Sequence, residues 1–209
     1  FIAYTSTKNL LQTHKSLDAI FAVADVLAFA AINAAKELGY SVPRDISIAG
    51  FDNIISGVDW GYYPDPWVFI RTYYHAGTRT LYIFDEARGN KMSNKVTAGI
   101  VKSKVTPGEL ILADLADEKA CADYRSYGLR CWSARKGPGS RELGVRWLQG
   151  LNAIVIDPDR CAPTLQEFLE WEYEVAPDGT VLGTLMDAND HGIDAARYAC
   201  SRIWQRKGA

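Results

Sequence analysis

The chain lacks the residue patterns that build metal–thiolate and disulfide frameworks. Its four cysteines stand far apart and form no Cys-x-x-Cys pair, and its only histidines are His14, His75 and His191. Structural zinc sites and disulfide scaffolds rely on closely spaced pairs of such residues. We therefore expect reduced thiols, as in the cytoplasm, and no structural zinc site.

Long apolar runs and an excess of charge of one sign are also absent. No apolar run reaches the roughly 18–20 residues that cross a bilayer, and the first residues, "FIAYTSTKNLLQTHK", do not resemble a signal peptide. The net charge of −2 gives no general attraction for nucleic acid, so contact with DNA would need a local basic patch. No Gly-x-x-x-x-Gly-Lys-Ser/Thr loop of a P-loop ATPase occurs. We expect a protein without a membrane segment, located in the cytoplasm.

Residues 16–54 alternate between strand and helix patterns. A short apolar run at 18–25 is followed by an alanine-rich helical segment at 26–40 and, after Pro43, by a second apolar run that begins at Ile46. This order predicts one βαβ unit, whose two strands are parallel.

The wording of this unit, "LDAIFAVADVLAFAAINAAKELGYSVPRDISIAGFDNI", resembles the effector-binding domain of lactose- and galactose-repressor-type regulators. It departs from that family at Ala24, where Asn is usual, and at Ala30, where Gly is usual. One hypothesis, implied by the resemblance, is binding of a sugar or other small effector through Asp25 or Asp52. The other, which we favour, is a folded remnant or fusion partner, because one βαβ unit cannot build a cleft between two lobes. We assign this domain to residues 1–55.

The pattern changes from Ser56 onward. A hairpin is predicted from a strand that begins at Val58, a Gly/Pro turn at 61–66 and a returning strand at 67–74, with a third strand at 79–89. Further predicted elements are helices at 91–104, 118–128, 139–151, 162–174 and 190–206, strands at 108–117, 129–135 and 152–159, and a turn at 176–180. This order is typical of an α/β, RNase H-like nuclease fold, in which helices flank a mixed central sheet.

Aspartates occur at the positions where an RNase H-like fold carries its catalytic carboxylates. Asp59 lies in the first strand, Asp114 ends the strand expected beside it, and Asp194 lies on the last helix. His191 precedes Asp194 by three residues, so both side chains project from one helical face. Oxygen ligands of this kind hold pairs of Mg²⁺ or Mn²⁺ ions about 3.5–4 Å apart, which activate water and neutralise the leaving oxygen in phosphodiester cleavage.

Each acidic residue also has a simpler interpretation. Asp59 could belong to a turn, Asp114 could cap the helix that follows it, and Asp194 could pair with Arg197 on a solvated face. For Asp190 we favour a role as helix cap, because Asp is a common cap residue. Spacing alone leaves these alternatives open.

Several separated phrases, in order from Ser56 to Arg206, resemble the C-terminal nuclease domain of tailed-bacteriophage large terminases. They are "GVDWGYYPDP", "LYIFDEARGNKMS", "ILADLADEKACADYRSYG", "ARKGPGS", "ELGVRWLQGL" and "DANDHGIDAARYA". The resemblance implies metal-binding and catalytic roles for Asp59, Asp114 and Asp194, with His191 as a further ligand or catalytic helper. We assign this domain to residues 56–209.

The same resemblance implies a metal-dependent DNA endonuclease that cuts concatemeric viral DNA during genome packaging. The cofactor would be Mg²⁺ or Mn²⁺, as two ions, and the substrate double-stranded DNA. In that family an ATPase motor precedes the nuclease, and the small terminase and portal are partners. Here the repressor-like segment stands in the motor's place, so this chain would cut DNA without translocating it. The alternatives are a small-molecule-binding fragment of a transcriptional regulator and a catalytically silent fusion.

The basic loop around "KGPGS" is a candidate for DNA contact. Lys136 matches a Lys-Gly phrase of the terminase family, and Arg135 and Arg141 flank it. A compact cationic loop suits a phosphate contact. A solvated basic loop remains an equal alternative.

Two further groups have both a functional and a structural interpretation. For Asp85 and Glu86, at the end of a strand, we favour solvated edge charges over catalysis. For Tyr62, Tyr63 and Trp67 we favour packing within the hairpin over stacking on bases.

Overall fold

The computed structural model describes residues 2–22, 25–50, 54–134, 137–185 and 189–205. It divides into two compact units, Phe1–Asn53 and Ile54–Ala209, which we describe separately. The division lies two residues before the boundary at 55/56 that the sequence predicts. None of the helices in the described ranges is long and apolar enough to cross a membrane.

The first unit contains two helices and a two-stranded parallel sheet. Its elements are α1 (Ile2–Thr13), β1 (Ala19–Ala22), α2 (Asp25–Glu37) and β2 (Ser47–Gly50). β1 and β2 pair in parallel, as the βαβ pattern predicts. Leu11 of α1, which the sequence analysis did not predict as a helix, packs with Ala35 and Ile46 in a small core. Of the two suggested effector-binding residues, Asp25 is described only as the first residue of α2, and Asp52 lies outside the described residues.

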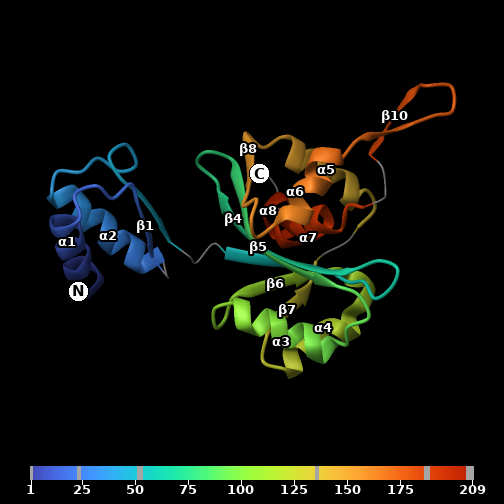
Figure 1. The fold of residues 1–209 in the computed structure, drawn as a ribbon, viewed down its shortest axis with the longest axis horizontal. Coiled ribbons are helices and arrows are strands. Elements are labelled where there is room, and N and C mark those ends of the chain that lie inside the picture. Colours follow the sequence, from blue (N-terminus) through green and yellow to red (C-terminus); the bar gives the residue numbers. More distant parts are fainter. Residues whose placement is uncertain (1, 23–24, 51–53, 135–136, 186–188, 206–209) are drawn as a thin grey trace. The chain divides into compact units, whose positions relative to one another are not determined.

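The second unit is built on a six-stranded mixed sheet (Figure 1). Its strands are β3 (Ile54–Asp59), β4 (Trp67–His75), β5 (Thr80–Gly89), β6 (Leu110–Ala113), β7 (Arg130–Ser133) and β8 (Ala153–Ile156). They lie in the order β7-β6-β3-β4-β5-β8, with β3–β4 and β4–β5 antiparallel and the other pairs parallel. This is the mixed sheet that the RNase H-like pattern predicts.

Helices cover both faces of this sheet. They are α3 (Asn94–Lys104), η1 (Leu115–Asp117), α4 (Glu118–Ser126), α5 (Ser140–Gln149), α6 (Ala162–Glu170), α7 (His191–Ala199) and α8 (Ser201–Trp204). In Figure 1, α3 and α4 cover one face and α5 to α8 the other. Side chains of β4 alternate between the two cores, because successive residues of a strand point to opposite faces: Phe69 packs with Tyr124 of α4, and Ile70 with Ile193 of α7.

Several predicted boundaries are wrong. β3 begins at Ile54 rather than at Val58, and α6 ends at Glu170 rather than at 174. The predicted turn at 176–180 connects β9 (Tyr173–Val175) and β10 (Val181–Leu185), which form an antiparallel hairpin. Residues 173 and 174, at the end of the predicted helix, therefore belong to a strand. The predicted C-terminal helix is divided at Cys200 into α7 and α8.

Helix α7 lies directly on β3. A Cβ atom on Gly57 would come within 1.8 Å of the carbonyl oxygen of Ala195, so only glycine permits this approach. Ala195 and Ala199 are fully buried in this contact. The close packing brings the first turn of α7 to the end of β3.

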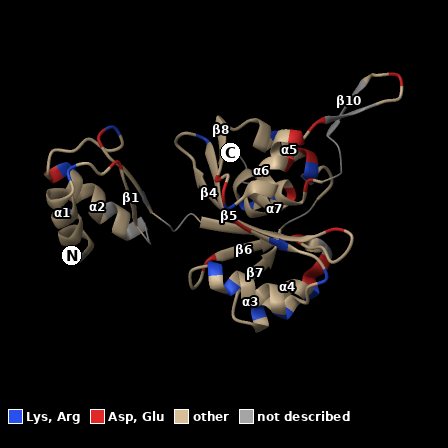
Figure 2. Ribbon diagram, in the orientation of Figure 1, with Lys and Arg blue, Asp and Glu red and all other residues tan. Residues whose placement is uncertain are grey.

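Charge is unevenly distributed over the second unit. Figure 2 shows lysine and arginine on α3 and α4, although the net charge of the chain is −2. The last turn of α3, for example, carries Lys102 and Lys104. The last turn of α3 is therefore locally basic within a chain of small net negative charge.

Candidate active site

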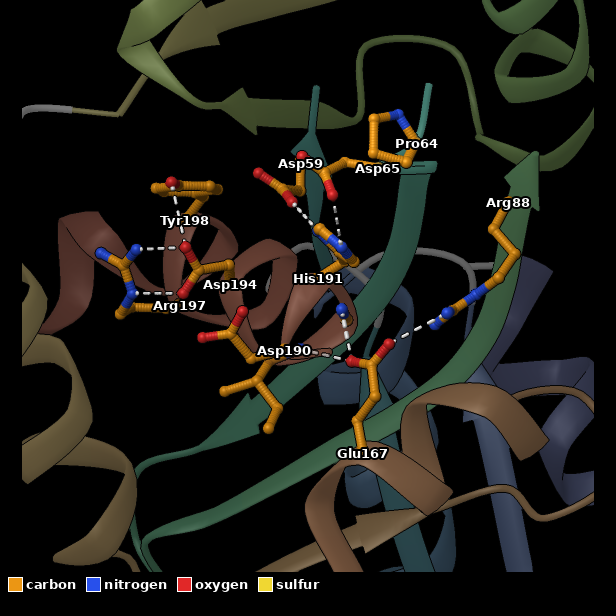
Figure 3. A network of polar contacts seen from close by, with 12 residues as sticks. Asp59, Pro64, Asp65, Arg88, Glu167, Asp190, His191, Asp194, Arg197 and Tyr198 are labelled. Carbon is orange, nitrogen blue, oxygen red and sulfur yellow. Dashed lines mark hydrogen bonds and ion pairs between the residues drawn. The ribbon is translucent and has the colours of Figure 1, made fainter. Parts of the chain in front are cut away.

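Asp59 and His191 form the centre of the site. Asp59 is the last residue of β3 and is 8% exposed, and His191 is the first residue of α7. Their side chains meet at 3.0 Å, between Asp59 Oδ2 and His191 Nδ1 (Figure 3). The fold thus joins two predicted site residues that are 132 positions apart in the sequence.

Asp114 lies at the same edge of the sheet. It directly follows β6, the parallel neighbour of β3, and its backbone N–H donates to the carbonyl of Val58 at 3.1 Å. The alternative that Asp114 caps α4 is wrong, because Asp117 does so by accepting from the N–H of Ala120 at 2.8 Å. Asp114 is therefore placed beside Asp59, as the strand order predicts.

Asp194 is held by an ion pair within α7. Its Oδ1 accepts from Arg197 Nε at 3.0 Å, and its Oδ2 accepts from Arg197 Nη2 at 2.7 Å and from the hydroxyl of Tyr198 at 3.3 Å. The pairing with Arg197 agrees with one sequence interpretation. The solvated setting does not, because Arg197 is only 4% exposed.

The charges of the two other aspartates act on Asp59. Burial raises the pKa of Asp59 to about 6, the hydrogen bond from His191 opposes this rise, and the negative charges of Asp194 and Asp114 add to it. The pKa of His191 is also raised, chiefly by its hydrogen bond with Asp59. A cation among these carboxylates would relieve the repulsion between them.

A further aspartate, which the sequence analysis missed, faces His191. Asp65 lies in the loop between β3 and β4, and its Oδ1 is 3.8 Å from His191 Nε2 (Figure 3). Both ring nitrogens of His191 therefore face carboxylates. The available signal was a second aspartate close behind Asp59 in "GVDWGYYPDP".

The predicted capping role of Asp190 is wrong. Asp190 occupies the N-cap position of α7, but its side chain makes no capping hydrogen bond. It accepts instead from Arg141 Nη2 at 2.9 Å. The carboxylate that caps α7 belongs to Glu167 of α6, which the sequence analysis did not identify: it accepts from the N–H of Gly192 at 2.6 Å.

The predicted DNA-contact residues are only partly described. Lys136 and Arg135 lie outside the described residues. Arg141 is partly exposed and engaged with Asp190. Its contact with DNA remains a prediction.

The interpretation of Asp85 and Glu86 as solvated edge charges is wrong. Glu86 is 8% exposed, pairs with Arg88, and accepts from the N–H of Thr164 at 3.2 Å. Asp85 pairs with Lys104 at 2.5 Å. Both carboxylates join separate elements of the second unit.

The three aromatic residues of the β3–β4 hairpin differ in role. Trp67 is buried and stacks on Phe69, as hairpin packing predicts. Tyr62 and Tyr63 are 61% and 67% exposed, so that interpretation is wrong for them. The ammonium of Lys91 lies 4.4 Å from the centre of the Tyr63 ring.

The donor chemistry of the site suits a hard divalent cation, because carboxylates and an imidazole are ligands for Mg²⁺ and Mn²⁺. In the described part of the chain, no three His, Cys, Asp or Glu side chains are gathered closely enough to form a complete ion site in this conformation. A carboxylate oxygen has two lone pairs, so Asp194 Oδ1, with one hydrogen bond from Arg197, retains capacity to bind an ion.

Comparison with known proteins agrees with this geometry. The family model of the terminase RNase H-like domain matches residues 59–202. The chain belongs to the terminase RNase H-like domain family. The large terminase subunit of Bacillus phage SPP1 is 38% identical over 166 residues, which are 78% of this chain and 39% of that protein. The chain therefore corresponds to well under half of that relative.

A solved structure shows the same fold. The crystal structure of the large terminase nuclease domain of bacteriophage SPP1 with bound Mn has a TM-score of 0.68 and 38% identity. The alignment covers 73% of this chain and 87% of that one. The fold and the family membership of the second unit are thus established together.

The first unit is similar to a different family. The model of a periplasmic binding protein-like domain matches residues 3–67. The transcriptional regulator MalR of Clostridium butyricum is 47% identical over 64 residues, which are 31% of this chain and 18% of that protein. The similarity thus spans only a small part of a regulator.

Proposed function

We propose that residues 54–209 form a divalent-metal-dependent DNA endonuclease, which cuts concatemeric viral DNA during genome packaging. The observation that carries this proposal is the pair of Asp59 and His191 at the end of β3, with Asp114 and Asp194 near enough to raise the pKa of Asp59. The SPP1 nuclease domain, which binds Mn, supports it through its 38% identity.

Asp59, Asp114, Asp194 and His191 would hold the ions, which we propose to be two Mg²⁺ or Mn²⁺. Such ions, when bound, activate water for attack on the scissile phosphorus and neutralise the charge that develops there. Hard oxygen donors on a rigid sheet edge suit this task.

The residues of the chain itself prepare the site in three ways. Burial of Asp59 limits the access of bulk water to its carboxylate. Arg197 fixes the orientation of Asp194 through two hydrogen bonds. His191 holds Asp59 through Nδ1 and leaves Nε2 toward the exposed Asp65, where it can carry a proton at the solvent side of the site.

The substrate would be double-stranded DNA. Arg141, with Lys136 and Arg135 in the preceding loop, would contact phosphates, and the exposed Tyr62 and Tyr63 would contact the strand beside the site. We expect little sequence preference. An ATPase motor, the small terminase and the portal would be partners in the parent system, in the cytoplasm of the infected cell.

Plasmid nicking tests the proposal. Wild type should nick supercoiled plasmid with Mn²⁺ or Mg²⁺ and not with EDTA, and Asp59→Ala and Asp194→Ala should abolish nicking. Asp117→Ala is the matched control, because Asp117 caps α4 and is not among the proposed ligands. Cutting in EDTA, or cutting that both site substitutions leave unchanged, would contradict the proposal. A protein that binds Mn²⁺ at Asp59 without cutting would support the alternative of a silent fusion.

A further inference from the structure

The first turn of α7 is capped by a side chain from another helix. Glu167 of α6 accepts hydrogen bonds at Oε2 from the N–H groups of Gly192 and Ile193, at 2.6 and 3.3 Å. The first N–H groups of a helix have no partner within the helix, so a carboxylate there is stabilising. The usual position for such a cap is occupied by Asp190, whose carboxylate is engaged with Arg141. Glu167 therefore caps α7, whereas Asp190, the N-cap residue of α7, does not.

Gly192, the residue after His191, has no side chain that would block this contact. A Cβ atom on Gly192 would lie 2.8 Å from Glu167 Oε2 and 2.2 Å from Thr164 Oγ1. Any larger residue would push the carboxylate away from the helix end. Gly192 therefore permits both the approach of α6 and the hydrogen bond from the helix end to Glu167.

Glu167 is itself fixed by a second ion pair. Its Oε1 accepts from Arg88 Nη1 at 2.9 Å, and Arg88 also pairs with Glu86, which accepts from the N–H of Thr164 at the start of α6. This chain of contacts joins β5, α6 and α7 (Figure 3). Glu167 is only 8% exposed, so its charge depends on these partners.

The consequence concerns His191. His191 is the first residue of α7, directly before the N–H groups that Glu167 holds, and its ring meets Asp59 at 3.0 Å. A shift of the first turn would move the imidazole away from the carboxylate. We propose that Glu167, held by Arg88, is a positioning residue that fixes His191 against Asp59 and thereby sets the affinity of the site for its divalent ion. This rests on the proposed function.

The direct test is Mn²⁺ binding by isothermal titration calorimetry on the full chain. Glu167→Ala should weaken binding about 10–100-fold, as loss of partners that orient a metal ligand does. Glu167→Gln should recover part of the loss, because the amide oxygen can still accept from the two N–H groups. Gly192→Ala should weaken binding with Glu167 and Arg88 intact.

The matched control is Glu109→Ala. Glu109 is as buried as Glu167, at 8% exposed, and pairs with Arg71 at 2.6 Å, but it contacts no proposed metal ligand. The Glu109→Ala variant should lower the melting temperature about as much as Glu167→Ala does, but it should not change the affinity for Mn²⁺. Equal weakening by Glu109→Ala and Glu167→Ala would mean a general loss of stability and would overturn the proposal.

A double-mutant comparison tests whether Glu167 acts through His191. In a His191→Ala background, Glu167→Ala should add little further loss of affinity, because the residue it positions is gone. An undiminished effect would overturn the proposal.

A measurement without metal separates this inference from the proposed function. The protein has three histidines, so the ring signals of His191 can be assigned by NMR with a His191→Ala reference. Glu167→Ala should shift or broaden these signals in EDTA, and Glu109→Ala should not. If Asp59→Asn and His191→Ala leave Mn²⁺ binding unchanged, the proposed metal site is wrong, and the NMR result alone decides whether Glu167 positions His191. If those two variants weaken binding and Glu167→Ala does not, only the present inference is overturned.

Discussion

At the scale of single residues, the surroundings of Asp59 disfavour the ionised form of its carboxyl group. It is nearly buried, and the carboxylates of Asp194 and Asp114 repel it, so its pKa is raised to about 6. A buried, ionised carboxylate among other carboxylates favours the binding of a cation. Without a cation, it lowers the stability of the folded protein. Function and stability therefore make opposite demands on this residue.

We predict that Asp59→Asn stabilises the metal-free protein at neutral pH and abolishes cutting. The folded state holds the proton of Asp59 up to about pH 6, whereas the unfolded chain loses it near the ordinary pKa of 3.8. Stability therefore falls as pH rises through this window, and the full cost remains at pH 8. The substitution should raise the free energy of unfolding by about 2–3 kcal/mol at pH 8 and by little at pH 4.

Denaturant unfolding in EDTA at both pH values measures this effect. Asp159→Asn, at an exposed position, is the control and should change neither value. A destabilised Asp59→Asn at pH 8 would show that the ionised carboxylate is favourable in the fold. With Mn²⁺ added, wild type should gain melting temperature and Asp59→Asn should not.

Tyr63 gives a second prediction at this scale. Its ring is 67% exposed in the loop that follows Asp59, with Lys91 against one face. Tyr63→Ala should weaken DNA binding about tenfold through lost stacking, with little change in kcat. Fluorescence anisotropy in an Asp59→Ala background measures binding without cleavage.

Tyr127→Ala is the control for this prediction, since Tyr127 is also exposed but lies at the end of α4. Equal losses for both tyrosines, or no loss for Tyr63→Ala, would remove the loop from the DNA contact.

At the scale of elements, the site depends on how closely α7 lies on β3. The helix supplies His191 and Asp194, and the strand supplies Asp59, so their separation is set by the residues between the two elements. Gly57 is the decisive one, because its Cβ position is occupied by the backbone of Ala195. Packing at this one contact controls the geometry of several site residues.

We predict that Gly57→Ala destabilises the second unit by about 1–3 kcal/mol or more and lowers cutting, because α7 must move away from β3. Thermal unfolding and plasmid nicking measure the two effects. The matched control is Gly99→Ala in α3, where nothing lies within 4 Å of the added atom. It should stabilise by about 0.5–1 kcal/mol, since glycine inside a helix is unfavourable. Equal behaviour of the two variants would show that the α7–β3 contact tolerates an added methyl group.

At the scale of the whole molecule, two units with similarity to different families follow one another in the chain. The division falls between Asn53 and Ile54, and the two large cores consist of residues from Val58 onward together with partly buried Ile55. The second unit therefore contains its own sheet and both of the cores that cover it.

We predict that residues 54–209 fold and cut DNA without the first unit, whereas a fragment that begins at Gly57 is less stable. The shorter fragment loses the pairing of Ile54 and Ile55 with β4, and the hydrogen bond from Ser56 to the buried Glu109 at 2.6 Å. The expected loss is about 3 kcal/mol, from apolar burial and one buried hydrogen bond. Chemical denaturation and nicking of both fragments and the full chain measure it. Failure of residues 54–209 to fold would show that the first unit contributes to the stability of the second.

Much of this architecture was readable from local patterns. The alternation of apolar runs and helical segments predicted β1, α2 and β2 and most elements of the second unit, because these patterns repeat every two or 3.6 residues. α1 was missed because its sequence contains Thr and Ser, which have a low helix propensity. The β9–β10 hairpin was also missed, although "PDG" at 177–179 is a hairpin signal, because the preceding residues continue a helical pattern.

The sequence by itself determined the resemblance to two families, the order of the strands along the chain, and the candidacy of Asp59, Asp114, Asp194 and His191. These features depend on short sequence motifs and on the spacing of residues along the chain. Only the tertiary structure decided which partner each carboxylate takes: Arg141 for Asp190, Arg197 in a buried setting for Asp194, and the end of α7 for Glu167. Contacts such as that of Glu167 with Gly192, 25 residues apart, follow from how helices pack on a sheet, and no local periodicity records that packing.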